Sequence, residues 1–184
     1  MRLFLALWPD ETVRRRIHRA GRLAVAAGRG RPVPAGNLHL TLAFLGEVAD
    51  TRREAVAQAA AAAAASVGPF ELSLTDIGIF QRGTFGRAGV LWLGGPATEP
   101  LTALVRDLKD RLIEAGFGLD RKPFRPHLTL ARKLPPLAQP ARGTTGPLDR
   151  AIAWSVSEIA LIASVTDPAG ARYQMLQTWP LRAA

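Results

Sequence analysis

The chain contains no cysteine among its 184 residues. This absence excludes disulfide bonds, thiolate nucleophiles and zinc sites built on cysteine. The chain also lacks a run of the roughly 18 to 20 consecutive apolar residues that a membrane-spanning helix needs. The apolar stretch at residues 3–8 is too short for the core of a signal peptide. Taken together, these absences predict a soluble, cytoplasmic protein with no membrane partner.

Lysine is scarce, although the chain is strongly basic. The net charge is +9, and among the 24 basic residues only Lys109, Lys122 and Lys133 are lysines. Guanidinium groups match phosphate oxygens well, so the arginine content is compatible with a polyanionic ligand. The abundance of alanine, arginine, glycine and proline fits GC-rich coding equally well. Charge alone therefore leaves the ligand open.

Histidine is scarce too, and two of the three histidines begin the same tetrapeptide. The sequence His-Leu-Thr-Leu occupies residues 39–42 and recurs, 88 residues later, at residues 127–130. Its alternation predicts a half-buried strand with histidine and threonine on one face and the leucines on the other. The repeat indicates two similar halves, each presenting an imidazole and a hydroxyl to a shared space. Two imidazoles at one cleft are suited to accept one proton and donate another near neutral pH.

Hydrophobic periodicity predicts three helices among short strands. The helices are expected over residues 11–27, with Asp10 as N-cap, over 51–66, and over 97–115, with Gly116 as the stop. The third helix is expected to bury Leu101, Leu104, Val105, Leu108, Leu112 and Ile113. The strands are expected over residues 2–8, 39–46, 70–80, 88–94, the second tetrapeptide, 152–164 and 173–180, with loops at 28–37 and 133–147. This order favours an α+β fold with antiparallel sheets, in one domain spanning residues 1–184.

Other interpretations of the histidines are weaker. A zinc site normally adds a third histidine, cysteine or carboxylate at close spacing, which neither tetrapeptide contains. Two buried structural histidines are an alternative, which the identical motif with its same-face hydroxyl disfavours. No Gly-x-Ser-x-Gly sequence supports a serine-type triad. The third histidine, His18, lies among arginines beside the apolar stripe of the first predicted helix, where a solvated position is expected.

The segments NLHLTLAFLGE (residues 37–47) and FRPHLTLAR (residues 124–132) closely resemble the paired motifs of the two-histidine (2H) phosphoesterase superfamily, above all its LigT-like RNA 2′,3′-cyclic phosphodiesterases. Further likeness lies in residues 2–7, 31–34, 90–93 and 164–181, so that it covers essentially the whole chain. The resemblance implies two pseudo-symmetric lobes, each an antiparallel sheet with flanking helices, around a central cleft. It implies no metal and no cofactor, and a reaction that opens an RNA 2′,3′-cyclic phosphate to a 2′-phosphate.

Within this resemblance, His39 and His127 are the implied catalytic residues. One deprotonates water and the other protonates the leaving 3′-oxygen. The residues alone leave this assignment open, and the resemblance favours His127 as base and His39 as acid. Thr41 and Thr129 are suited to donate hydrogen bonds to non-bridging phosphate oxygens. Arg132 is a candidate phosphate clamp, although on an ideal strand it lies one position off the face of His127, and a solvated arginine is the alternative.

Residues near the motifs are candidates for contact with the rest of the substrate. Phe44, Phe85 and Tyr173 are candidates for stacking on a terminal base, with core packing as the alternative for each. Arg31 and Arg125 flank the motifs and are candidates for steering RNA phosphates, with a solvated role as the alternative.

Three functions are compatible with the sequence. The first is hydrolysis of a 2′,3′-cyclic phosphate at RNA 3′ ends, and the second is the same chemistry on a small nucleotide or other small cyclic phosphate. The third is an RNA-end-binding or ligation accessory protein. The RNA functions predict a basic groove that leads to the cleft, whereas a small-molecule enzyme predicts a closed pocket. We expect a monomer in each case.

Overall fold

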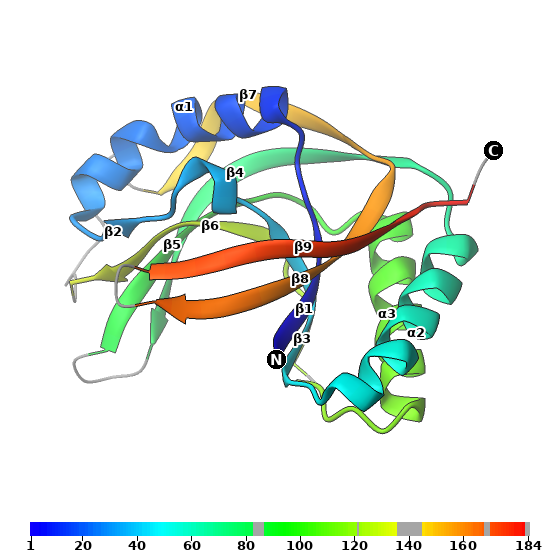
Figure 1. Ribbon diagram of the computed structural model, residues 1–184. Helices are drawn as coiled ribbons and strands as arrows, with labels where there is room; N and C mark the ends of the chain where they lie inside the picture. Colours follow the sequence, from blue (N-terminus) through cyan, green and yellow to red (C-terminus); the bar gives the residue numbers. More distant parts are fainter. Residues whose placement is uncertain (83–86, 121, 136–144, 168–169, 183–184) are drawn as a thin grey trace.

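The computed structural model describes residues 1–82, 87–120, 122–135, 145–167 and 170–182. Within these ranges the chain forms an antiparallel β-sheet with three α-helices (Figure 1). The strands are β1 (Arg2–Leu7), β2 (Arg31–Pro32), β3 (Leu40–Glu47), β4 (Phe70–Arg82), β5 (Arg87–Gly94), β6 (His127–Leu134), β7 (Gly146–Val156), β8 (Glu158–Asp167) and β9 (Gly170–Pro180). The helices are α1 (Glu11–Gly28), α2 (Arg53–Ser66) and α3 (Glu99–Glu114), with the 3₁₀ turns η1 (Ala35–Asn37) and η2 (Asp50–Arg52). The predicted α+β class with antiparallel pairing is confirmed.

The sheet consists of two halves that meet at the strands carrying the repeated tetrapeptide. The first half has the strand order β3-β1-β8-β9, and the second half has the order β7-β4-β5-β6. Strand β2 pairs with β6 outside this path. Across the junction, β3 pairs with β6 at Leu40 and Leu128. Neighbouring strands within each half pair along most of their length, so the halves are lobes that share a narrow junction.

Two of the helices each follow a strand of one half of the sheet but pack against the other half. Helix α1 follows β1 of the first half and leads to β2, yet it packs against β5, β6 and β7 of the second half. Helix α3 connects β5 to β6, yet it packs against β3, and against α2, which also contacts β8 and β9. Figure 1 shows α1 over one end of the molecule and the α2–α3 pair at the other end. This exchange of covering helices ties the two lobes together.

Local sequence signals explain where the helices begin and end. Asp10 accepts a hydrogen bond from the backbone N–H of Val13 at 2.8 Å, which caps the start of α1 as predicted. Helix α3 ends just before Gly116, whose φ of +81° is a left-handed conformation that favours glycine. The N–H groups of Gly116 and Phe117 then donate to the carbonyls of Ile113 and Leu112, which satisfies the last turn. The predicted stop is therefore confirmed.

The predicted strand over residues 152–164 is wrong. Strand β7 ends at Val156 and β8 begins at Glu158, so the chain passes between the two halves at Ser157. The apolar pattern continues across Ser157 with almost no break, so the sequence predicts one strand where the structure has two. Residues 133–147 are not wholly a loop either, because β6 continues to Leu134 and β7 begins at Gly146. Residues 136–144 lie outside the described part of the chain.

The predicted apolar face of α3 is right except at one position. Five of its residues are buried, namely Leu101, Leu104, Val105, Leu108 and Leu112. Ile113 is 45% exposed. It lies about 100° around the helix from Leu112, which turns it away from the sheet.

We expect the substitution Asp10→Ala to lower the free energy of unfolding by roughly 1 kcal/mol, because it removes the cap of α1. Chemical denaturation followed by circular dichroism measures this change. Asp110→Ala is the matched control, since it removes an exposed carboxylate from the interior of α3 without touching a cap. Equal effects of the two substitutions would contradict a capping role for Asp10.

Candidate active site

His39 and His127 lie at the junction of the two halves, on one face of the sheet. His127 is the first residue of β6, and His39 immediately precedes β3. Both histidines and both threonines of the tetrapeptides are half-buried, whereas all four leucines are buried. This alternation is the one that the sequence predicted.

The pairing of Leu40 with Leu128 sets the relation between the two motifs. Because the strands are antiparallel, the residues that flank this pair place each histidine opposite the threonine of the other motif. The leucines point into the core, so the two imidazoles and two hydroxyls share the opposite face. The arrangement is pseudo-symmetric, with one histidine contributed by each lobe.

The two imidazoles make the same hydrogen bond. His39 Nδ1 lies 2.7 Å from the carbonyl oxygen of Asn37, and His127 Nδ1 lies 2.7 Å from the carbonyl oxygen of Arg125. A carbonyl oxygen only accepts, so Nδ1 carries the proton and donates it in both residues. The Nε2 atom of each ring is therefore the position that is left to gain or lose a proton.

A β-bulge brings Arg132 onto the face of His127. Trp92 of β5 pairs with Thr129, but Leu91 pairs with Ala131, so one additional residue is inserted in β6. The insertion shifts the alternation by one position. On an ideal strand Arg132 would lie off this face, and the bulge is the physical reason why it does not.

The first motif contains the same bulge. Ala6 pairs with Thr41 while Leu5 pairs with Ala43, which inserts one residue in β3. Phe44 therefore occupies the position that corresponds, 88 residues earlier, to Arg132. Phe44 is 49% exposed, and the guanidinium carbon of Arg2 lies 5.0 Å from its ring centroid. Phe44 is therefore not a core residue: its ring is partly exposed, and the guanidinium group of Arg2 lies over one face of it.

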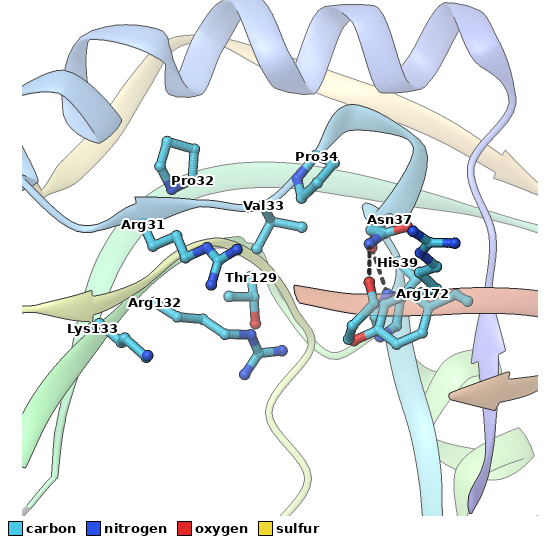
Figure 2. A pocket seen from close by; sticks show the side chains of 12 residues that line it. Arg31, Pro32, Val33, Pro34, Asn37, His39, Thr129, Arg132, Lys133 and Arg172 are labelled. Carbon is cyan, nitrogen blue, oxygen red and sulfur yellow. Dashed lines mark hydrogen bonds between the residues drawn. The ribbon is translucent and has the colours of Figure 1, made fainter. Parts of the chain in front are cut away.

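A basic pocket of about 630 Å³ opens beside His39 (Figure 2). It is lined by Arg31, Pro32, Val33, Pro34, Asn37, His39, Thr129, Arg132, Lys133, Ala171, Arg172 and Tyr173. Arg31 and Arg132 come from paired positions of β2 and β6, and Figure 2 shows the two side chains reaching toward Thr129, Arg31 from above it and Arg132 from below. The lining residues are basic, polar or apolar, and none of them is acidic. The pocket is therefore suited to an anion.

Three aromatic rings surround the imidazole of His39. Trp8 stacks on the imidazole with ring centroids 5.4 Å apart, and Phe4 and Tyr173 lie at 4.8 and 5.2 Å. Burial is the largest cause that lowers the pKa of His39, and repulsion from Arg132 and His127 acts in the same direction, while the hydrogen bond to Asn37 opposes them. Together these effects lower the pKa of His39 to about 4. His39 is consequently neutral at neutral pH when the pocket holds no anion.

His127 faces a second hollow on the other side of the junction. This hollow of about 510 Å³ is lined in part by Phe80, Trp92 and Arg125. The ring of Phe80 meets the imidazole edge-on at 4.9 Å. Gly94 pairs with His127, and a Cβ atom at that position would overlap the carbonyl oxygen of Pro126. The close approach of β5 to the start of β6 therefore requires glycine there.

The remaining candidates from the sequence are distributed around these two hollows. Arg31 and Tyr173 line the pocket of His39, where Tyr173 packs against the imidazole, and Arg125 lines the hollow of His127. Phe85 lies outside the described residues. His18 is exposed on α1, and it lines neither hollow.

Several residues that shape the site cannot be recognised from the sequence. Trp8 and Phe80 touch the histidines from strands or loops more than 30 residues away along the chain. Asn37 provides its carbonyl to His39, and its amide also donates to the carbonyl of Ala171 at 3.0 Å. Each histidine donates to the carbonyl of the residue two positions before it, Asn37 or Arg125. Because any residue has this backbone carbonyl, the sequence shows no preferred side chain at that position. Arg172 has no signal within the motifs.

In the described part of the chain, no three histidine, aspartate or glutamate side chains gather closely enough to hold a metal ion. Among the same residues, no helix has the length and apolar character that crossing a membrane requires.

The depressed pKa of His39 predicts a pH-dependent stability. Between pH 6.5 and about 4 the unfolded chain protonates this residue while the folded protein does not, so the free energy of unfolding falls as the pH falls through this window. We expect this contribution to be on the order of 2 kcal/mol and to vanish in His39→Gln. Denaturation series at pH 7 and pH 4 measure it, with His18→Gln as the control that retains it. An unchanged pH dependence in His39→Gln would refute the prediction.

Comparison with known proteins places this geometry in a family. The family model of the 2′-5′ RNA ligase superfamily matches residues 9–168. The RNA 2′,3′-cyclic phosphodiesterase of Escherichia coli (strain K12) is 32% identical over 98% of this chain and 96% of that protein. The protein of the same name from Thermus thermophilus is 35% identical over 99% of this chain and 91% of that protein. A Geobacillus stearothermophilus relative is 36% identical, but the match covers 79% of this chain and 46% of that protein.

The fold agrees with solved structures over its whole length. The crystal structure of E. coli LigT in apo form has a TM-score of 0.83 with this protein, at 31% identity, and the match covers 99% of this chain and 98% of that chain. The complex of E. coli LigT with 3′-AMP gives the same TM-score. The resemblance seen in the two tetrapeptides is thereby confirmed, and this chain belongs to the 2′-5′ RNA ligase superfamily of 2H phosphoesterases.

Proposed function

We propose that this protein hydrolyses the 2′,3′-cyclic phosphate at RNA 3′ ends to a 2′-phosphate, with His39 and His127 as a metal-independent acid–base pair. One observation carries the proposal. Two imidazoles from pseudo-symmetric strands share one face of the sheet, and each is held through Nδ1 so that its Nε2 is available. The names and the coverage of the relatives support the same activity.

The reaction needs one proton removed and one proton supplied. The oxygen of a water molecule attacks phosphorus while the bond from phosphorus to the 3′-oxygen breaks. Nε2 of a neutral histidine takes the proton from the water, and Nε2 of a charged histidine gives its proton to the 3′-oxygen. The attacking and leaving oxygens lie on opposite sides of phosphorus, and the two histidines come from opposite sides of the junction. We assign the base to His127 and the acid to His39.

The neighbouring donors suit the charge of the phosphate. Thr129 and Arg132 line the pocket of His39, and the hydroxyl of Thr129 and the guanidinium of Arg132 are suited to bind non-bridging oxygens. Thr41 holds the equivalent position in the first motif. A bound phosphate also offsets the repulsion that Arg132 and His127 exert on His39. Substrate binding therefore favours the protonated imidazole that the acid step requires.

The cations around the pocket support an RNA end rather than a small cyclic phosphate. Arg31, Arg132, Lys133 and Arg172 all line it, which is more positive charge than one phosphodiester requires. Further phosphates of a polynucleotide would meet this charge. An accessory protein without catalysis would need the same basic surface, but it would not need two imidazoles with free Nε2 atoms.

The protein should convert an oligonucleotide that ends in a 2′,3′-cyclic phosphate to the 2′-phosphate, in the presence of excess chelator. We expect His39→Ala and His127→Ala each to lower kcat by roughly 10²–10⁴-fold, the usual effect of losing a positioned acid or base. Thr129→Val removes one phosphate hydrogen bond and should cost roughly tenfold. Chromatography of the products with authentic 2′- and 3′-phosphate standards measures the outcome.

His18→Ala, assayed on a mononucleoside 2′,3′-cyclic phosphate beside the two histidine variants, is the control for this series, because it removes the histidine that lines neither hollow. Activity that disappears in chelator and returns with zinc or manganese would overturn the metal-independent mechanism. RNA binding without any hydrolysis would favour the accessory function.

The acid role of His39 predicts that this residue takes up a proton when product binds. In the free protein the imidazole should titrate near pH 4, and a bound nucleoside 2′-monophosphate should raise its pKa by more than one unit. Nuclear magnetic resonance of the histidine ring protons follows both titrations, and the spectrum of His39→Gln assigns the signal. A pKa that stays near 4 in the complex would transfer the acid role to His127.

A further inference from the structure

Helix α1 carries an excess of positive charge that the other helices lack. It contains five arginines and one glutamate, whereas α2 contains one arginine and one glutamate, and α3 contains three basic and four acidic residues. A bias toward arginine from GC-rich coding would act on all three helices. The excess on α1 is therefore a local property of this surface.

The arginines of α1 form a groove on the exposed side of the helix. Arg15, Arg19 and Arg22 are exposed and line this groove of about 640 Å³, and the other lining residues of the helix are Glu11, Arg14 and His18. Arg15 and Arg22 are two turns apart, which spans about 10 Å. The Glu11 carboxylate lies 3.1 Å from Arg14 and 4.0 Å from Arg15.

This groove contains cations that the protein itself does not neutralise. In the described part of the chain, no carboxylate lies within ion-pair distance of Arg19 or Arg22. By contrast, α3 pairs Arg111 with Asp107 at 3.0 Å. A polyanion in this groove would therefore meet two neighbouring guanidinium groups, those of Arg19 and Arg22, that have no carboxylate partner among the described residues.

The other wall of the groove is the segment that leads into His39. Ala35 and Gly36 of η1 line the groove, while Asn37 and residues 31–34 line the pocket of His39. Figure 2 shows α1 running alongside this segment, above Pro32 and Pro34. The groove and the pocket are therefore the two sides of one short turn.

We propose that the Arg15–Arg19–Arg22 face of α1 binds the phosphodiester backbone of RNA upstream of its cyclic 3′ end. This inference rests on the proposed function, which places the 3′ end in the adjoining pocket. Backbone phosphates repeat at roughly 3.4 Å along one strand of a stacked helix, so the face covers about three of them. Contacts of this kind are independent of sequence, and they favour polynucleotides over mononucleotides.

The test compares two substrates in one triple variant, Arg15→Gln with Arg19→Gln and Arg22→Gln. We expect kcat/KM for an RNA of about ten nucleotides with a cyclic 3′ end to fall tenfold or more at low salt. For this RNA, the slope of log kcat/KM against log salt concentration should become less steep by about two, because three phosphate contacts to a single strand are lost. Hydrolysis of a mononucleoside 2′,3′-cyclic phosphate should stay at the wild-type rate, which also shows that the variant is folded.

Arg16→Gln is the matched control, because Arg16 lies on the same helix, outside the groove, and donates to the carbonyl of Ala153. Equal losses on both substrates, or no loss on the RNA, would overturn the proposal. Binding of the same RNA with a 3′-hydroxyl, followed by fluorescence anisotropy, tests the α1 face without catalysis. If the wild-type protein hydrolyses neither substrate, the proposed function fails, and this binding measurement still decides whether α1 contacts RNA.

Discussion

The pairing of Leu40 with Leu128 is the contact on which the candidate site depends. Both side chains are fully buried, so the pair is held by the core of the sheet rather than by the polar residues beside it. Once these two residues are opposite each other, the antiparallel direction places each histidine across from the threonine of the other motif. The polar cluster is therefore a consequence of apolar packing on the opposite face.

The narrow junction also explains why the candidate site stays open to solvent between the two lobes. In the described part of the chain, strands β3 and β6 pair only at Leu40 and Leu128, so the two halves of the sheet separate on either side of this contact. The exchange of covering helices compensates for the narrow contact, since α1 and α3 each tie one lobe to the other. The hollow beside His39 and the hollow beside His127 both lie next to this junction.

The two histidines are equivalent in backbone but not in environment. Both donate from Nδ1 to a carbonyl, and both precede the same bulge, which places Arg132 and Phe44 at corresponding positions. His39, however, is enclosed by aromatic rings, and its pKa is lowered to about 4. Pseudo-symmetry in the backbone therefore coexists with different surroundings for the two imidazoles.

The amino-acid sequence by itself determined the elements and the paired motif. Alternation over four residues predicted the strands of both tetrapeptides, and Asp10 and Gly116 marked the ends of α1 and α3. These signals are short-range, because a strand face or a helix cap involves residues only a few positions apart. They sufficed for the α+β class and for the two histidines as candidates.

Only the tertiary structure decided what surrounds those histidines. Trp8 and Phe80 reach them from distant segments, and the bulge that turns Arg132 toward them depends on how β5 and β6 align. The lowered pKa of His39 likewise depends on burial by three separate strands or loops. No periodic pattern or fixed spacing in the sequence marks these contacts, because each one joins residues that are far apart along the chain and meet only in the folded protein.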